Sequence, residues 1–130
     1  MPITEWDDSL ALGIEDLDQQ HKQLIGYINT IYDAVHSENR QEIVQEMIGN
    51  LSKYADEHFA LEERYMEESN YPGLDNQKRE HKYFIVKLLS LEAEGHDSPA
   101  AYAEVINFLM SWLINHVRRT DMQLKNHLRP

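Results

Sequence analysis

The chain has 130 residues, a length at which one domain can bury a substantial core but two cannot. Twelve Lys and Arg residues against 23 Asp and Glu residues give a formal net charge of −11 without any basic patch, so nucleic acid and anionic membranes are not expected as partners. Cysteine is absent, which excludes disulfides, zinc-thiolate sites and cysteine nucleophiles and leaves nitrogen and oxygen to hold any metal.

The N-terminal residues predict an arm rather than a helix. Residues 1–15 show no helical pattern, and the first ten have neither the basic start nor the apolar middle of a signal peptide. No run of about 18 apolar residues occurs in the chain. We therefore expect a cytoplasmic protein without membrane insertion. Trp6 is expected either to pack the arm against the domain or to contact another chain.

Four segments with helical periodicity follow, because apolar residues recur in them at intervals of three and four. They span about residues 17–37, 40–69, 75–93 and 99–118, and a short C-terminal segment, 119–130, completes the chain. Ser98 followed by Pro99 suits the start of the fourth helix. Capping boxes are expected at the first two helices, formed by Asp16 with Gln19 and by Asn39 with Glu42.

Amphipathic helices joined by short loops most simply form an antiparallel up-down-up-down four-helix bundle. The sequence thus predicts an all-α fold, with residues 1–130 in a single domain. The stripe that the second helix buries is expected to comprise Ile43, Met47, Leu51, Tyr54, His58, Leu61, Glu62 and Tyr65.

Each predicted helix carries one histidine on its apolar stripe. These residues are His21, His58, His81 and His116. In an up-down bundle, the starts of the first and third helices lie at the same end as the last turns of the second and fourth, so the four imidazoles should converge at a similar depth. One buried histidine is more often an ordinary core residue than a ligand, but four at one level indicate a metal site.

Two carboxylates accompany the histidines. Glu62 lies one turn after His58 on the same stripe, and Asp121 follows His116 by five residues. Taken alone, Glu62 suits the solvated rim of the bundle and Asp121 its surface. A metal-free structural bundle is a further alternative, but a buried glutamate without a cationic partner would be costly. Together with the histidines they form the donor set of a non-haem iron or manganese pair, whereas zinc is saturated by about four ligands.

These motifs resemble those of the hemerythrin family, specifically the single-domain bacterial hemerythrins. The stretches "EWDDSLALGIEDLDQQH", "HFALE", "YPGLDNQKREH" and "WLINHVRRTD" follow the family order and cover nearly the whole chain. The resemblance implies two iron ions joined by an oxo or hydroxo bridge. It implies His21 and His58 as terminal ligands of one iron, His81 and His116 as terminal ligands of the other, and Glu62 and Asp121 as bridging ligands.

The same resemblance implies O2 binding without a chemical transformation. In such proteins O2 enters at the iron with fewer histidines and is held end-on as hydroperoxide, which serves oxygen storage, transport or delivery, for example to an oxygen-consuming enzyme. The resemblance places Leu24, Phe59, Trp112 and Leu113 in the O2 pocket, although ordinary core packing would equally explain them. The acidic surface predicts a monomer, because like charges repel.

The chain departs from the family pattern at position 77, where glutamine replaces the first histidine of an HxxxH motif. An amide oxygen is a weaker ligand than imidazole, so Gln77 is expected to bind iron weakly or to be replaced by water. Two further functions stay open, and the altered position favours the first of them. One is a di-iron peroxidase, oxidase or ferroxidase. The other is a sensing module for oxygen, redox state or iron, which would need a second domain to receive the signal.

Overall fold

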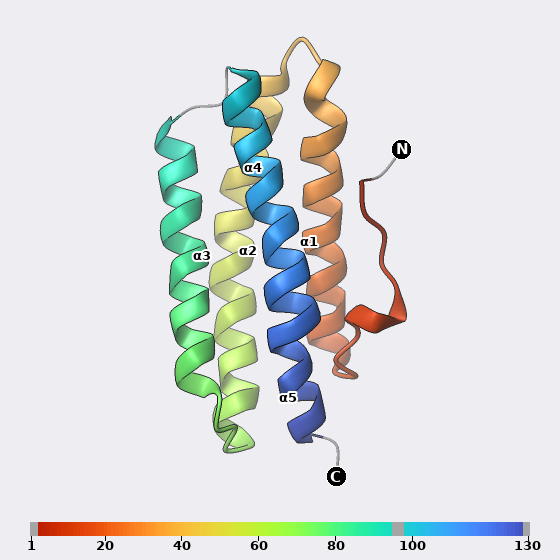
Figure 1. Ribbon diagram of the computed structural model, residues 1–130, viewed down its shortest axis with the longest axis vertical. Helices are drawn as coiled ribbons and strands as arrows, with labels where there is room; N and C mark the ends of the chain where they lie inside the picture. The colour runs from red at the N-terminus through yellow and green to blue at the C-terminus, as the bar shows by residue number, and fades with distance from the viewer. Residues whose placement is uncertain (1–2, 95–97, 129–130) are drawn as a thin grey trace.

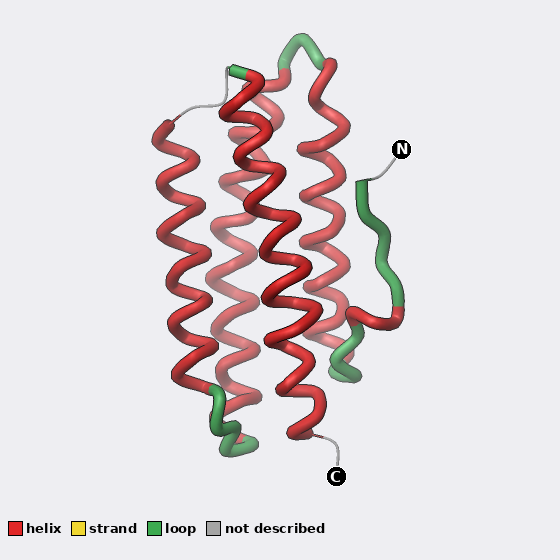
Figure 2. Tube along the Cα trace, in the orientation of Figure 1, coloured by secondary structure: helices red, strands yellow, loops and turns green. Residues whose placement is uncertain are grey.

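The computed structural model describes residues 3–94 and 98–128, and over these ranges the only regular secondary structure is helical. Four long helical columns lie side by side, with the connections at the two ends (Figures 1 and 2). The elements are the 3-10 turn η1 (Asp8–Leu10), α1 (Glu15–Asp33), the 3-10 turn η2 (Ala34–His36), α2 (Arg40–Glu68), α3 (Leu74–Glu94), α4 (Pro99–Trp112), the π-helical segment η3 (Leu113–Thr120) and α5 (Asp121–Leu128).

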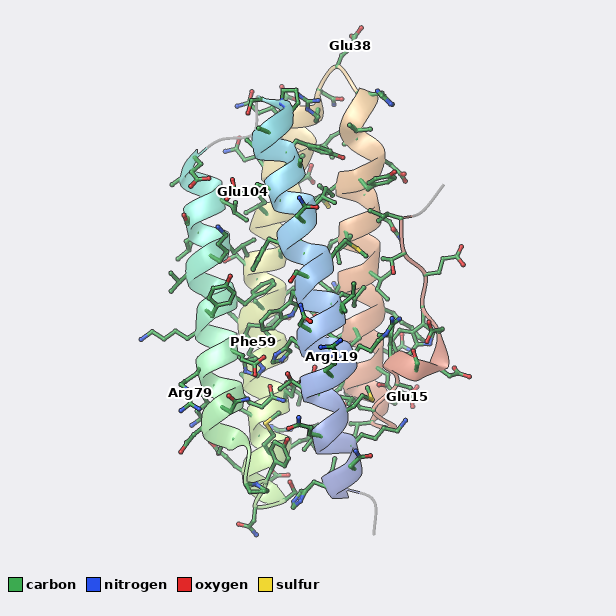
Figure 3. The ribbon with its side chains drawn as sticks, in the orientation of Figure 1. Glu15, Glu38, Phe59, Arg79, Glu104 and Arg119 are labelled. Atoms are coloured by element: carbon green, nitrogen blue, oxygen red, sulfur yellow. The ribbon has the colours of Figure 1, made fainter. Side chains whose placement is uncertain are left out.

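The helices form the antiparallel bundle that the sequence predicts. Helix α1 packs against α2 and α4, and α3 packs against α2 and α4, so each column touches its sequence neighbours. The main core lies between them; it is built from buried apolar residues of all four columns, among them Leu24, Leu51, Phe84 and Leu109. Figure 3 shows Phe59 between the helices, while Glu38 and Arg79 point outward. Among the described helices, none combines the length and apolar character needed to cross a membrane.

The C-terminal boundary of the fourth helix differs from the prediction. The sequence predicts a helix to residue 118 and a separate short segment after it, but the helical column continues through η3 and α5 to Leu128. The apolar stripe is interrupted there because η3 changes the number of residues per turn, so α-helical periodicity no longer detects it. The other helices begin and end within a few residues of the predicted positions.

The predicted side-chain capping of the helices is confirmed for α4 but not for α1 and α2. Ser98 caps α4 as expected, since its side chain accepts a hydrogen bond from the N–H of Ala101. The N-caps of α1 and α2 are Ile14 and Asn39, and neither makes a side-chain capping bond. Asp18 instead accepts hydrogen bonds from the backbone of the arm, at residues 12 and 13.

The N-terminal arm lies along α1 (Figures 1 and 2). The side chain of Asn29 accepts hydrogen bonds from the N–H groups of Ile3 and Thr4 and donates one to the carbonyl of Thr4. Trp6 packs against the main core, with the ammonium of Lys22 over its ring. Of the two roles expected for Trp6, the structure therefore shows the first, because it holds the arm on the bundle.

Candidate metal centre

Four histidines, one from each helical column, meet inside the bundle. His21 lies early in α1, His58 late in α2, His81 early in α3 and His116 in η3, and no side chain of the four is more than 3% exposed. The ring centroids of His21 and His58 are 4.8 Å apart, and those of His81 and His116 are 5.1 Å apart. The imidazoles therefore converge as two pairs.

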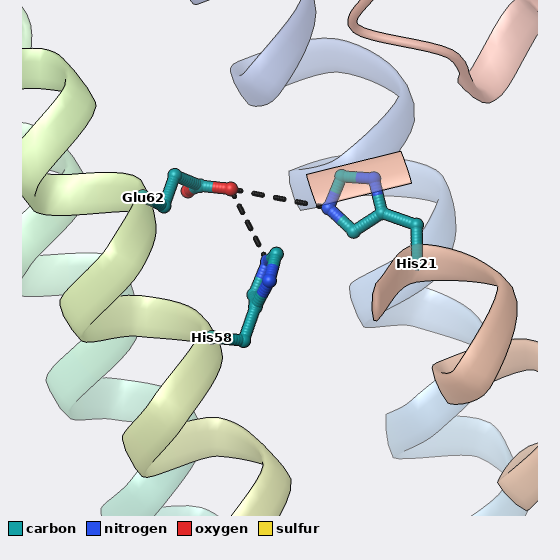
Figure 4. A group of neighbouring side chains, drawn as sticks. All are labelled: His21, His58 and Glu62. Carbon is teal, nitrogen blue, oxygen red and sulfur yellow. Dashed lines mark ion pairs between the residues drawn. The ribbon is translucent and has the colours of Figure 1, made fainter. Parts of the chain in front are cut away.

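Glu62 lies between the two pairs. Its Oε2 is 3.2 Å from Nε2 of His58 and 3.9 Å from Nε2 of His21, as Figure 4 shows. Its Oε1 is 3.0 Å from Nε2 of His81 and 3.9 Å from Nε2 of His116. Each pair thus forms a triad with Glu62, and the potential ligand atoms of a triad all lie within 4.8 Å of one another. One carboxylate is shared by two candidate metal positions.

Asp121 links the same two pairs, and the π-helical segment η3 places it there. Residues five apart on an α-helix point about 140° away from each other. In η3 the N–H of Asp121 instead donates to the carbonyl of His116, which is the wider turn of a π-helix. Asp121 Oδ1 then lies 3.1 Å from Nε2 of His116, and Oδ2 lies 3.4 Å from Nε2 of His21. A second carboxylate therefore contacts one imidazole of each pair.

Side chains from neighbouring helices orient three of the four imidazoles. In each case Nδ1–H donates to the neighbour, so Nε2 faces the central carboxylates. The acceptors are Gln20 Oε1 for His58 at 2.7 Å, Glu63 Oε2 for His81 at 2.8 Å and Glu80 Oε1 for His116 at 2.9 Å. The sequence analysis missed these three residues, whose one signal is that each directly precedes or follows a candidate ligand in the chain.

Gln77 is fully buried one turn before His81, on the same face of α3. Its Nε2 donates a hydrogen bond of 3.0 Å to Oδ1 of Asp121, while its Oε1 has no hydrogen-bond partner. The amide therefore holds the carboxylate that links the two histidine pairs.

Apolar side chains cover the imidazoles. Phe59 stacks on His81 with ring centroids 3.9 Å apart, and Trp112 stacks on His116 at the same distance. Leu24 and Leu113 are buried in the same core cluster. The four residues expected to line an O2 pocket are thus buried, and two of them also fix the planes of imidazole rings.

Burial and neighbouring charges shift the pKa values of the side chains in the cluster. Burial alone would raise the pKa of Glu62, but the neighbouring imidazoles of His116, His58 and His81 hold it well below its usual value. Burial alone would lower the pKa of His116, but Asp121, with Glu62 and Glu80, raises it well above the usual range. The pKa of His21 is raised in the same way by Asp121, whereas burial keeps the pKa of His58 below normal.

The donor set fits a metal pair. Buried polar side chains are normally hydrogen-bonded, because an unpaired buried polar atom is costly. Within residues 3–94 and 98–128, the buried side-chain nitrogens and oxygens without a hydrogen-bond partner all belong to this cluster; they are Nδ1 and Nε2 of His21, Oε2 of Glu62, Oε1 of Gln77, Nε2 of His116 and Oδ2 of Asp121. Most of them face the space between the histidine pairs and the carboxylates, where cations would satisfy them.

The comparison with protein families gives the relationship of the whole chain. The model of the hemerythrin HHE cation binding domain matches residues 12–128. The chain belongs to the hemerythrin family. This membership confirms the resemblance inferred from the sequence motifs.

Individual hemerythrins support the same relationship. A bacteriohemerythrin of Stenotrophomonas maltophilia is 35% identical, with 98% of this chain and 86% of the relative covered. A myohemerythrin of Riftia pachyptila is 33% identical, with 95% and 92% covered. A crystal structure of a hemerythrin point mutant matches the fold with a TM-score of 0.83 over the full length of both chains, at 20% identity.

Proposed function

We propose that this hemerythrin holds two iron ions and binds O2 reversibly. His21 and His58 would be the terminal ligands of one iron, His81 and His116 those of the other, and Glu62 and Asp121 would bridge the two. The observation that carries the proposal is the position of Glu62, whose two oxygens each face one pair of histidines. Family membership supports iron as the metal, because hemerythrins are di-iron proteins that bind oxygen.

An iron pair held by His21, His58, His81, His116, Glu62 and Asp121 would supply the two electrons that reversible binding of O2 requires. The chain's own residues contribute a dry, rigid environment. Phe59 and Trp112 stack on two of the imidazoles, and Leu24 and Leu113 close the core around them. Excluding water slows the loss of reduced oxygen species from such a site. Storage, transport or delivery of O2, for instance to an oxygen-consuming enzyme, follows from reversible binding.

The alternative functions are a di-iron peroxidase or oxidase and a sensor of oxygen or iron. Hemerythrins are oxygen carriers rather than enzymes, so family membership does not favour the enzyme. We propose that the protein is a monomer, because a net charge of −11 opposes self-association. We also propose that it is located in the cytoplasm.

The proposal is tested by loading the metal-free protein with ferrous iron under anaerobic conditions, measuring iron per chain, and then admitting O2. We expect two irons per chain and a visible charge-transfer band that appears with O2 and disappears when O2 is removed. One iron per chain without such a band would overturn the proposal. Steady consumption of peroxide with an electron donor would instead indicate the enzyme. Glu62→Ala is the matched control, because it removes the shared carboxylate, and it should not retain the pair.

A further inference from the structure

One of the two polar atoms of the Gln77 side-chain amide makes a hydrogen bond, and the other makes none. Nε2 donates to Oδ1 of Asp121 at 3.0 Å, and Oε1 is buried without a hydrogen-bond partner. Turning the amide over would place its oxygen against the carboxylate, where two acceptors would repel each other. The hydrogen bond to Asp121 therefore fixes which end of the amide is the nitrogen, and it leaves Oε1 as a buried acceptor in need of a donor.

The candidate metal position beside Gln77 is short of one imidazole. Its triad consists of Glu62, His81 and His116, which are two imidazoles and one carboxylate. The triad on the other side, with His21 and His58, has the same composition. Two imidazoles with one carboxylate leave open positions on non-haem iron. The two metal positions are thus alike in donor count, and each has room for a ligand from outside the chain.

We propose that Gln77 is not a metal ligand and that the position it leaves open binds a small hydroxylic ligand. Water, hydroxide and hydrogen peroxide belong to this class, and each carries a proton that it donates to Oε1 of Gln77. A histidine at this position would not provide this acceptor, because its ring nitrogen would itself bind the metal. The inference rests on the proposed iron pair and deepens it, since it assigns a second ligand position and the residue that recognises the ligand.

Azide counts the open positions, because it binds ferric iron and carries no proton. The oxidised protein, with its iron content measured first, is titrated with azide and followed by visible absorption. We expect two azides per iron pair in the native chain and one in Gln77→His, where the imidazole fills the vacancy. Two irons with one azide in the native chain would overturn this inference and leave the iron pair intact. Fewer than two irons would overturn the proposed function and this inference with it.

Gln77→Leu tests the hydrogen bond, because leucine keeps apolar bulk but has neither donor nor acceptor. We expect two irons per chain, an affinity for hydrogen peroxide about tenfold lower, as one lost hydrogen bond implies, and an azide affinity changed less than about twofold. The peroxide affinity is taken from the spectral change directly after mixing. With both irons retained, an unchanged affinity of Gln77→Leu for hydrogen peroxide would overturn the proposal.

Gln20→Leu is the matched control. Gln20 also supplies an amide beside the cluster, but its Oε1 accepts from Nδ1 of His58 and does not face the open position. This variant should leave the ratio of peroxide affinity to azide affinity unchanged. An equal change of that ratio in both variants would show that Gln77 has no specific role and would overturn the inference.

Discussion

The two histidine pairs differ in the groups that accept hydrogen bonds from their Nδ1 atoms. His81 and His116 donate to the carboxylates of Glu63 and Glu80, whereas His58 donates to the neutral amide of Gln20 and Nδ1 of His21 has no partner. A carboxylate behind an imidazole makes it a more basic ligand. The candidate metal position beside Gln77 is therefore the one whose two histidines are the stronger donors.

Glu80→Gln removes this charge while keeping an acceptor of the same size. We expect the affinity for the iron ion that His81 and His116 would bind to fall about tenfold, in the range seen when the hydrogen-bond partner of a metal ligand is changed. Competition with a chelator, read as iron retained per chain, measures the effect. Glu104→Gln is a suitable control, because Glu104 is exposed and pairs with Lys87 away from the cluster. Equal iron retention in both variants would argue against a role for the Glu80 charge.

Protons compete with iron for the same nitrogen atoms. The carboxylate of Asp121 raises the pKa of His116 well above its usual value and raises the pKa of His21, so both imidazoles take up protons at a higher pH than free histidine, and each must be neutral to bind metal. We expect iron loading at pH 7 to release protons and the apparent affinity for iron to fall as the pH is lowered. Calorimetry in buffers of different ionisation enthalpy measures the release. Loading at pH 7 without proton release would contradict this expectation.

The candidate ligands were accessible to sequence reasoning, but the residues that support them were not. His21, His58, His81 and Glu62 stand out because polar residues on an apolar stripe are unusual. Glu63 and Glu80 are two among 23 acidic residues, and each sits on the more exposed side of its helix. Composition and spacing do not distinguish them from solvated surface charges, because their role depends on which helix packs next to them.

At the level of single helices, periodicity predicted the existence of α1 to α4 but not every face. Helix α2 buries Val44 and Ile48 rather than the expected Ile43 and Met47, which are only partly buried. Each expected residue is followed in the chain by another apolar residue that could be buried in its place. An α-helix of 29 residues also drifts relative to a simple repeat of three and four. The pattern alone therefore does not choose between them.

The turn between α2 and α3 offers a sharp test of packing. A Cβ added to Gly73 would lie 2.7 Å from the ring of Tyr71, whereas Gly49, inside α2, has open space around it. We expect Gly73→Ala to lower the free energy of unfolding by about 1–3 kcal/mol through overpacking. Gly49→Ala should raise it by about 0.5–1 kcal/mol through helix propensity. Urea denaturation measures both, and effects of the same sign would contradict the packing explanation.

Across the whole molecule, the candidate metal centre draws residues from all four helical columns, so metal binding there would be coupled to global stability. Without metal, buried polar atoms of four cluster residues besides Gln77 have no partner. Iron that binds only the folded state should add about 3 kcal/mol at a free concentration of 100 times Kd. We therefore expect a lower melting temperature after chelation, and its recovery on reloading with ferrous iron. Equal melting temperatures with and without iron would show that the cluster does not hold the metal in the folded protein.

The π-helical segment has a genetic consequence. A π turn holds one residue more than an α turn, and here that extra residue lies between His116 and Asp121, in a segment where Arg118 and Arg119 are exposed. Deleting one codon at this point would let the column wind as an ordinary α-helix and would place the carboxylate four residues after His116, which is the spacing of Glu62 from His58. The other three columns would keep their sequences. A single codon thus decides whether these two candidate metal ligands are joined by a π turn or by an α turn, and with it the rotation of α5 about its axis.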